Sequence, residues 1–385
     1  MRRRIPLAWL QLSREKARML VAIAGITFAD VLMFLQLGFR SALFEGAVEI
    51  QTSLKGDIFL ISDRYRSLIS RDKFTERRLY QALGYTGVQA VIPIYLDYVQ
   101  WKNPVNKQIW NMFIIGFNPD GNVMMLPSVE ANLDKLKFPD TVMFDKGARK
   151  EFGPIPQMFQ QTGPFKTEIE NREVEVVGLF ELGTSFGVNG HLITSDLNFL
   201  RLFGRRREKG LIELGVIQLE PGANLAQVMK NLKAGLPDDV RVLSKQEFIE
   251  REQGFWNAST PVGYVFDLGA VIGFIVGAVI VYQILYSDVS DHLSEYATLK
   301  AIGFDDNYLL SVVFQEALIL AAMGFLPGLV LSLGFYQITR QATLLPMAMT
   351  IGRAAFVLAL TATMCCVSAA FSIRKLQTAD PSDIF

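Results

Sequence analysis

The sequence predicts an α-helical membrane protein with four transmembrane helices and a large α+β extracytoplasmic domain between the first and second helices. Half of its 385 residues are hydrophobic, and the mean hydropathy is +0.26. Such a chain is more apolar than a typical soluble protein, yet 20% of its residues are charged, which is too many for a protein that lies wholly in a membrane. The apolar residues concentrate in four runs, and one long segment of mixed composition follows the first run.

Each of the four apolar runs reaches the length of about 20 residues that a helix needs to cross a bilayer. The runs extend over about Met19–Phe39, Val262–Tyr286, Tyr308–Tyr336 and Ala354–Phe371. The first run is interpreted as an uncleaved helix and not as a signal peptide, because it is longer than the apolar part of a signal peptide and Asp30 interrupts it.

Basic residues set the predicted orientation, since short cytoplasmic flanks are enriched in Lys and Arg. They precede the first run and follow the last one: Arg2, Arg3, Arg4, Arg14, Lys16, Arg18, Arg374 and Lys375. Both termini are therefore expected in the cytoplasm. The predicted order starts with a cytoplasmic amphipathic segment (1–18), a helix (19–44), the extracytoplasmic domain (45–258) and a second helix (259–286). A cytoplasmic loop (287–307), a third helix (308–336), an outer loop (337–353), a fourth helix (354–373) and a cytoplasmic tail (374–385) follow.

The extracytoplasmic segment has the pattern of a soluble α+β domain. Short β-like runs recur between turn signals, at Asp57–Ile61, Val88–Leu96, Met112–Phe117, Val174–Phe180 and Leu214–Leu219. After the last of these, an amphipathic helix is predicted with Leu225, Val228, Met229 and Leu232 on one face, followed by a strand over Asp238–Leu243. The Pro- and Gly-rich segment Gly153–Phe165 is expected to be an exposed loop that separates two subdomains.

Few residues of the outer segment suggest a binding site. The basic cluster Arg205–Arg207, with Lys209, favours a solvated loop over the alternative of contact with anionic headgroups or a partner protein. His191 has neither a cysteine nor a second histidine near it in the sequence, so a zinc site is not expected. The chain's two cysteines, Cys365 and Cys366, are adjacent within an apolar run and predict no disulfide framework.

Three glycines in the second apolar run recur every four residues, at Gly269, Gly273 and Gly277. This spacing puts them on one helical face, where they permit close approach of another helix. Packing within the chain and an interface between two copies remain equal alternatives. Asp30, Asp267 and Glu316 lie in or near apolar runs, and a structural or interface role is favoured for them over a proton relay.

The loop 287–307 between the second and third runs has the pattern of a contact element. A short helix is predicted over Leu293–Ile302, with Gly303 as its end. Such a helix, exposed between two spans, can act as a lever that another protein moves. The segment Ile5–Leu20 before the first run is amphipathic and suits a helix at the membrane interface.

No catalytic motif accompanies these elements. The sequence contains no phosphate-binding loop of the Gly-x-x-x-x-Gly-Lys-Ser/Thr type, no His-Glu-x-x-His, no Gly-x-Ser-x-Gly and no dinucleotide-binding glycine pattern. With two histidines in all, it offers little for histidine-based catalysis. An enzyme and a cofactor bound by this chain are therefore not expected. The formal net charge of zero gives no indication of nucleic-acid binding.

The stretch Glu295-Tyr-Ala-Thr-Leu-Lys-Ala-Ile-Gly-Phe304 resembles the signature of permeases of the FtsX/MacB type, and the order of one span, a large outer domain and three spans is similar as well. Within that family, four stretches resemble the DevC branch: the opening Ile5–Leu12, Phe28-Ala-Asp30 in the first run, Asp57–Leu60 after that run, and Asp291–Lys300. Many members carry a basic residue shortly before the glutamate, whereas Asp291 and His292 stand there in this chain.

The resemblance implies that the loop holds a coupling helix that docks on a separate ABC ATPase, which binds ATP and Mg²⁺. The residues matching that segment are Leu293, Glu295, Tyr296, Leu299, Lys300, Ala301 and Gly303. It further implies a homodimer in the bacterial inner membrane, a membrane fusion (adaptor) protein, a TolC-like outer-membrane channel and, for the DevC branch, glycolipid export. The alternative is a lipoprotein-release permease or FtsX-like control of a periplasmic partner. A sensing receptor is disfavoured, because no cytoplasmic output domain is evident.

Overall fold

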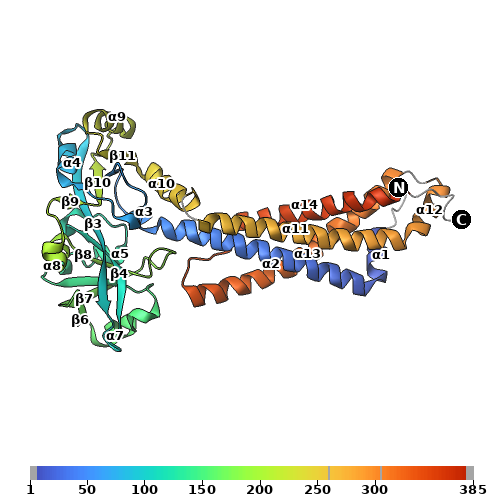
Figure 1. Ribbon diagram of the computed structural model, residues 1–385, viewed down its shortest axis with the longest axis horizontal. Coiled ribbons are helices and arrows are strands. Elements are labelled where there is room, and N and C mark those ends of the chain that lie inside the picture. The colour runs from blue at the N-terminus through green and yellow to red at the C-terminus, as the bar shows by residue number, and fades with distance from the viewer. Residues whose placement is uncertain (1–6, 259–260, 304–305, 379–385) are drawn as a thin grey trace. The chain divides into compact units, whose positions relative to one another are not determined.

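The computed structural model describes residues 7–258, 261–303 and 306–378, and Figure 1 shows its helices and strands. The chain forms two compact units. Of the described residues, 7–41, 262–303, 306–342 and 347–378 belong to a helical bundle. Residues 42–258, 261 and 343–346 belong to a sheet domain. The fold is thus a set of apolar helices with an α+β domain inserted between the first and second of them, as the sequence predicts.

The helical bundle contains a short N-terminal helix, four long helices and one short helix between two of them. They are α1 (Leu7–Arg14), α2 (Lys16–Ala47), α11 (Pro261–Asp291), α12 (Leu293–Ala301), α13 (Asp306–Thr343) and α14 (Ile351–Thr378). Within the described part of the chain, four stretches are long and apolar enough to cross a membrane: Lys16–Ala47, Pro261–Asp291, Leu310–Thr343 and Ile351–Ile373.

All four long helices continue beyond the apolar runs that predict them, and α11 and α13 show the reason. α11 reaches Asp291 and α13 reaches Thr343, although their apolar runs end at 286 and 336. Neither extension contains glycine or proline, so nothing in its backbone stops the helix, and only the side chains change from apolar to polar. Hydropathy therefore marks the apolar core of a helix and not its end.

Small and aliphatic side chains fill the interior of the bundle, among them Ala22, Ile26 and Ala29 of α2. Polar side chains add hydrogen bonds between helices. The Thr27 hydroxyl donates to the Gly324 carbonyl at 3.0 Å, and the Ser368 hydroxyl donates to the Ala278 carbonyl at 2.7 Å. Close packing of small residues with a few such bonds is typical of helices that associate within a membrane.

The sheet domain contains eleven strands and eight α-helices in the residues described. The strands are β1 (Ile58–Ser62), β2 (Phe74–Thr75), β3 (Val88–Lys102), β4 (Ile109–Phe117), β5 (Thr141–Asp145), β6 (Phe165–Ile169), β7 (Arg172–Phe180), β8 (His191–Ser195), β9 (Leu211–Ile212), β10 (Leu214–Leu219) and β11 (Val240–Ser244). The helices are α3 (Glu49–Ser53), α4 (Glu76–Gln81), α5 (Pro127–Glu130), α6 (Leu133–Leu136), α7 (Ile155–Thr162), α8 (Asp196–Phe203), α9 (Leu225–Gly235) and α10 (Lys245–Ala258).

Nine of these strands form one mixed sheet in the order β11-β1-β10-β3-β4-β8-β5-β7-β6, and β6 also pairs with β3. Strands β3, β4, β8, β5, β7 and β6 therefore form a closed ring, from which β10, β1 and β11 extend. The two sides of the sheet carry separate cores. Along β4, Met112 and Ile114 belong to one core, while Phe113, Ile115 and Phe117 belong to the other, as the alternation of a strand requires.

The predicted strand–helix–strand unit at the end of the domain is confirmed as β10, α9 and β11. The Asn224 side chain caps α9 by accepting from the Gln227 backbone N–H at 3.1 Å. Val228, Met229 and Leu232 are buried as expected, but Leu225 on the first turn is exposed.

The prediction of a loop between two subdomains at Gly153–Phe165 is wrong. This segment contains α7, and strand β6 starts at Phe165. Gly153 and Gly163 flank the helix at positive φ, so these glycines mark the ends of a helix and not an extended loop. Strands on both sides of the segment, β5 and β6, belong to the same sheet, and there is no division into subdomains at this point.

The prediction of a solvated basic loop at Arg205–Arg207 fails for one of its members. Arg205 and Arg206 are exposed, but Arg207 is buried, and its guanidinium donates to the Glu213 carboxylate at 2.6 Å. The same guanidinium lies over the ring of Phe199 at 4.8 Å. Arg207 is therefore a core residue whose charge the domain accommodates with a carboxylate and an aromatic face.

His191 also has a structural place. Its Nδ1 lies 3.1 Å from Oδ2 of Asp145, and both side chains are buried. The Asp145 carboxylate accepts from the backbone N–H groups of Leu182 and Gly183 as well. Asp145 thereby joins the two ends of the segment 182–191. No group of metal-binding side chains is found among the described residues.

Candidate functional site

The short helix α12 follows α11 almost without a break. Only His292 separates the two helices, and hydrogen bonds cross the junction: His292 N–H donates to the Asp288 carbonyl at 3.1 Å, and Tyr296 N–H donates to the His292 carbonyl at 3.0 Å. The helix ends at Ala301, and Gly303 shortly after it has a φ of 98°, the left-handed conformation that glycine adopts readily. The prediction of a helix over Leu293–Ile302 that stops before Gly303 is confirmed to within one residue.

The side chains of α12 divide between an outer and an inner face. Glu295 and Thr298 are exposed, and beyond the helix Ile302 is 70% exposed. Leu293 is half-buried, while Tyr296 is 1% exposed and packs in the core of the bundle with residues such as Val289. Tyr296 therefore anchors the helix, and Glu295 is available to a partner. Such an exposed helix on an apolar anchor can receive a protein and pass on its movement.

Three further residues named from the sequence, Leu299, Lys300 and Ala301, belong to α12, but their side chains lie outside the described part of the structure. Gly303 is exposed. Of the predicted coupling residues, the structure therefore gives side-chain positions to Leu293, Glu295 and Tyr296.

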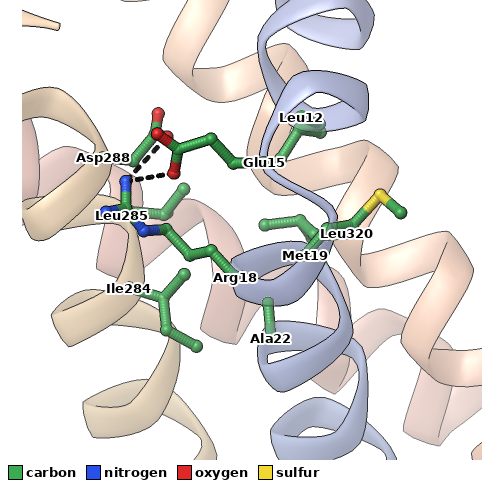
Figure 2. Close-up of a pocket in the computed structure, with 9 residues that line it drawn as sticks. All are labelled: Leu12, Glu15, Arg18, Met19, Ala22, Ile284, Leu285, Asp288 and Leu320. Carbon is green, nitrogen blue, oxygen red and sulfur yellow. Dashed lines mark ion pairs between the residues drawn. The ribbon is translucent and has the colours of Figure 1, made fainter. Parts of the chain in front are cut away.

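A cluster of charged side chains lies directly before the start of α12, which we call the root of α12. No pattern in the sequence predicts this cluster as a site. Arg18, in the first turn of α2, contacts Glu15 at 2.6 Å and Asp288 at 3.5 Å (Figure 2). It also contacts Asp291 at 2.5 Å. We call these four residues the Arg18 cluster. A partial signal exists in the sequence, since Asp288 and His292 are four residues apart on a helix that continues past the apolar run. The sequence alone could not show that α2 supplies the cation.

The three glycines of α11 face other helices of the same chain. A Cβ atom at Gly273 would lie 3.3 Å from Met33 of α2, and one at Gly277 would lie 2.7 Å from Ala29 and would also overlap Met364 of α14. At Gly269 a Cβ atom would overlap Gln36 of α2. These contacts support packing within the chain, and a role of the same glycines in a homodimer stays a prediction.

We expect Gly277→Val to destabilise the bundle by about 1–3 kcal/mol, because the added atoms would force α2 and α14 away from α11. Gly334→Val is the matched control, since a Cβ atom at Gly334 meets nothing within 4 Å. The measurement is the thermal unfolding of both variants in detergent, together with their oligomeric state. A Gly277→Val protein that unfolds like the control but changes its oligomeric state would favour the alternative of an interface between copies.

The three acidic residues near the apolar runs have different surroundings. Asp30 is fully buried, and its Oδ1 accepts from the Thr361 hydroxyl at 2.6 Å. Glu316 is also fully buried. Asp267 is half-exposed and pairs with Arg40 of α2 at 2.7 Å. Asp30 and Asp267 thus hold helices together, as the structural interpretation expects.

Comparison with known proteins finds similarity in the C-terminal part of the chain. Residues 268–381 match the family described as FtsX-like permease C-terminal. No curated protein sequence matches the chain. Among solved structures, the periplasmic region of MacB from Actinobacillus actinomycetemcomitans is 12% identical, with a TM-score of 0.33, over 51% of this chain and 92% of that one.

The extracellular domain of the noncanonic ABC-type transporter YknZ from Gram-positive bacteria is 15% identical, with a TM-score of 0.33, over 49% of this chain and 99% of that one. The family match includes the whole of α12, α13 and α14 and most of α11. From the second apolar helix onward, the chain is similar to the FtsX-like permeases.

Proposed function

We propose that this chain is the permease subunit of an ABC-type transporter whose ATP is hydrolysed by a separate subunit. One observation carries the proposal: within the segment that matches FtsX-like permeases, α12 presents an exposed Glu295 while Tyr296 fixes the helix to the bundle. A helix with one face fixed to the bundle and the other face exposed can contact a partner protein and pass the partner's movement to the bundle.

In this proposal α12 is the coupling helix. Glu295 and Lys300 contact the ATPase, Gly303 follows the end of the helix, and Leu293, Leu299 and Ala301 complete the docking segment. Tyr296 carries the resulting movement into the bundle, since its ring is buried there. ATP and Mg²⁺ belong to the partner ATPase, and this chain needs no cofactor of its own.

The finer assignment follows the resemblance to the DevC branch. The permease acts as a homodimer in the bacterial inner membrane, with both termini in the cytoplasm and the sheet domain in the periplasm. It works with an adaptor protein and a TolC-like channel, and it exports a glycolipid or a similar hydrophobic molecule. The absence of an ATP-binding motif from the sequence supports the requirement for a separate ATPase.

The test is a photo-reactive amino acid placed at Glu295, with a second probe at the exposed Phe138 of the sheet domain as control. After illumination in the native membrane, mass spectrometry identifies the captured proteins. We expect the Glu295 probe to capture an ABC ATPase and the Phe138 probe to capture none. An ATPase captured at Phe138 and not at Glu295 would overturn the proposal. A lipoprotein chaperone or a cell-wall hydrolase co-purifying in place of an adaptor would keep the ATPase contact but replace the export function.

A further inference from the structure

The Arg18 cluster lies where the start of α2 meets the end of α11, and at this point each helix carries a charge that its own dipole disfavours. Arg18 lies in the first turn of α2, where the helix dipole disfavours a cation. Asp288 and Asp291 lie in the last turn of α11, where the dipole disfavours an anion. Glu15 already pairs with Arg18 at 2.6 Å within its own segment, and the meeting of the two helix ends adds Asp288 and Asp291 as partners. The pairing with the two aspartates therefore depends on the tertiary contact between α2 and α11.

Burial increases this dependence. Asp288 is 4% exposed, and the fully buried Glu316 of α13 interacts with the same carboxylate. His292 also lies near this carboxylate, with its Nδ1 3.6 Å from Oδ1 of Asp288, but the same Nδ1 donates to the Asp288 carbonyl at 3.0 Å and the imidazole is charged only when protonated. The guanidinium of Arg18 is thus the permanent positive charge in contact with Asp288, and its removal would leave that buried carboxylate next to another acid.

A small cavity borders the cluster. This cavity of about 10 Å³, which is the size of a single water molecule, lies between the aliphatic part of Arg18 and its neighbours on α1, α11 and α13 (Figure 2). Leu12 of α1 and Leu320 of α13 are among the residues that line it. Arg18 thus meets Asp288 about one turn before α12 begins, beside side chains from α1 and α13.

We propose that Arg18 is a positioning residue: its ion pairs with Asp288 and Asp291 latch the root of α12 to α2, so that a movement of α12 is passed to α2 as well as to α11. α2 is one uninterrupted helix from Lys16 to Ala47, and its last residues belong to the sheet domain. The latch therefore gives the lever a second continuous helix through the bundle. This inference rests on the proposed function in one respect, namely that an ATPase moves α12.

The first test needs no ATPase. Amide hydrogen exchange of the full chain in lipid nanodiscs is compared between the wild type and Arg18→Gln. We expect exchange in residues 287–303 to be about tenfold faster or more in the variant, because a buried carboxylate loses its partner. Arg18→Lys keeps the charge and is expected to restore most of the protection. Arg40→Gln is the matched control, since it removes the α2–α11 ion pair with Asp267 at the other end of the helices.

Equal exchange in Arg18→Gln and the wild type, or an increase that Arg40→Gln reproduces at 287–303, would overturn the latch. If Arg18→Gln does not fold, Asp291→Asn takes its place, because Asp291 is half-exposed and its loss is milder. The second test adds the co-purified ATPase with ATP and vanadate. Exchange should change in both α12 and the first turns of α2 in the wild type, and in α12 alone in Arg18→Gln. Failure to find an ATPase would refute the proposed function without affecting the first test.

Discussion

Replacing Arg207 by methionine is expected to destabilise the sheet domain by about 3–5 kcal/mol, because it leaves the Glu213 carboxylate buried without its cation. Both side chains are 2% exposed, and their oxygen and nitrogen atoms lie 2.6 Å apart. Glu213 also accepts from the Leu96 N–H at 2.9 Å, so the carboxylate is fixed next to the central strand β3. The measurement is the free energy of opening from native-state amide exchange in β3 and β10 of the full chain.

The loss of stability should depend on pH, and its sign follows from the pKa of Glu213. Burial raises this pKa above its ordinary value of 4.5, and Arg207 opposes the rise. Without Arg207 the folded-state pKa rises further. A carboxyl group with a raised pKa costs no stability below pH 4.5, where it is protonated in both states, and destabilises the fold as the pH increases towards the folded-state value. Arg207→Met should therefore be less harmful at pH 5 than at pH 8.

Two further variants separate the buried ion pair from a general effect of charge removal. Arg206→Met removes an arginine that is largely exposed in its pair with Glu170, and a change within about 1 kcal/mol is expected. The double variant Arg207→Met/Glu213→Gln should regain most of the stability, since it removes both charges while the glutamine side-chain oxygen can still accept from the Leu96 N–H. A similar stability of Arg207→Met and Arg206→Met at pH 8 would contradict the role assigned to Arg207.

Arg207 also shows what the sequence could not predict. Three consecutive arginines carry the same signal, and only tertiary contacts decide that one of them is buried between β3 and α8. The signals that worked are periodic or conformational. Hydrophobic runs of bilayer length predicted the four long helices, and short β-like runs between turn signals predicted β1, β3, β4, β7 and β10.

The strands that the sequence does not predict are short and mix apolar with polar residues. β5, β6 and β8 each contain five residues, and β8 is buried over its whole length, so no alternation distinguishes it from a loop. The segment around α7 has the sequence pattern of a loop, because glycine and proline are common both in loops and at helix ends. At the candidate site, the sequence pattern predicted α12 and the glycine that follows it. The Arg18 cluster is not visible in such a pattern, because Arg18 and Asp291 are 273 positions apart in the chain.

Alanine substitutions at the neighbouring residues Tyr296 and Glu295 of α12 are expected to impair the protein in different ways. Tyr296→Ala removes a large side chain that is 1% exposed, and loss of such an aromatic group costs about 3–5 kcal/mol. The helix should then detach from the bundle, with faster amide exchange over residues 293–303 and at least tenfold weaker binding of the co-purified ATPase. Tyr296→Phe keeps the ring in the core and should retain most of both properties.

Glu295→Ala removes an exposed carboxylate, so the stability of the permease should change by no more than about 0.5 kcal/mol and the exchange of α12 should stay as in the wild type. Binding of the ATPase should nevertheless weaken by about tenfold, as expected when a contact at the centre of an interface is lost. The two variants thus separate docking of the lever from recognition by the partner. Normal ATPase binding by Tyr296→Ala would show that the partner does not need α12 in its anchored position. Normal binding by Glu295→Ala would remove Glu295 from the contact, and the exposed Thr298 and Ile302 on the same side would then be the next residues to replace.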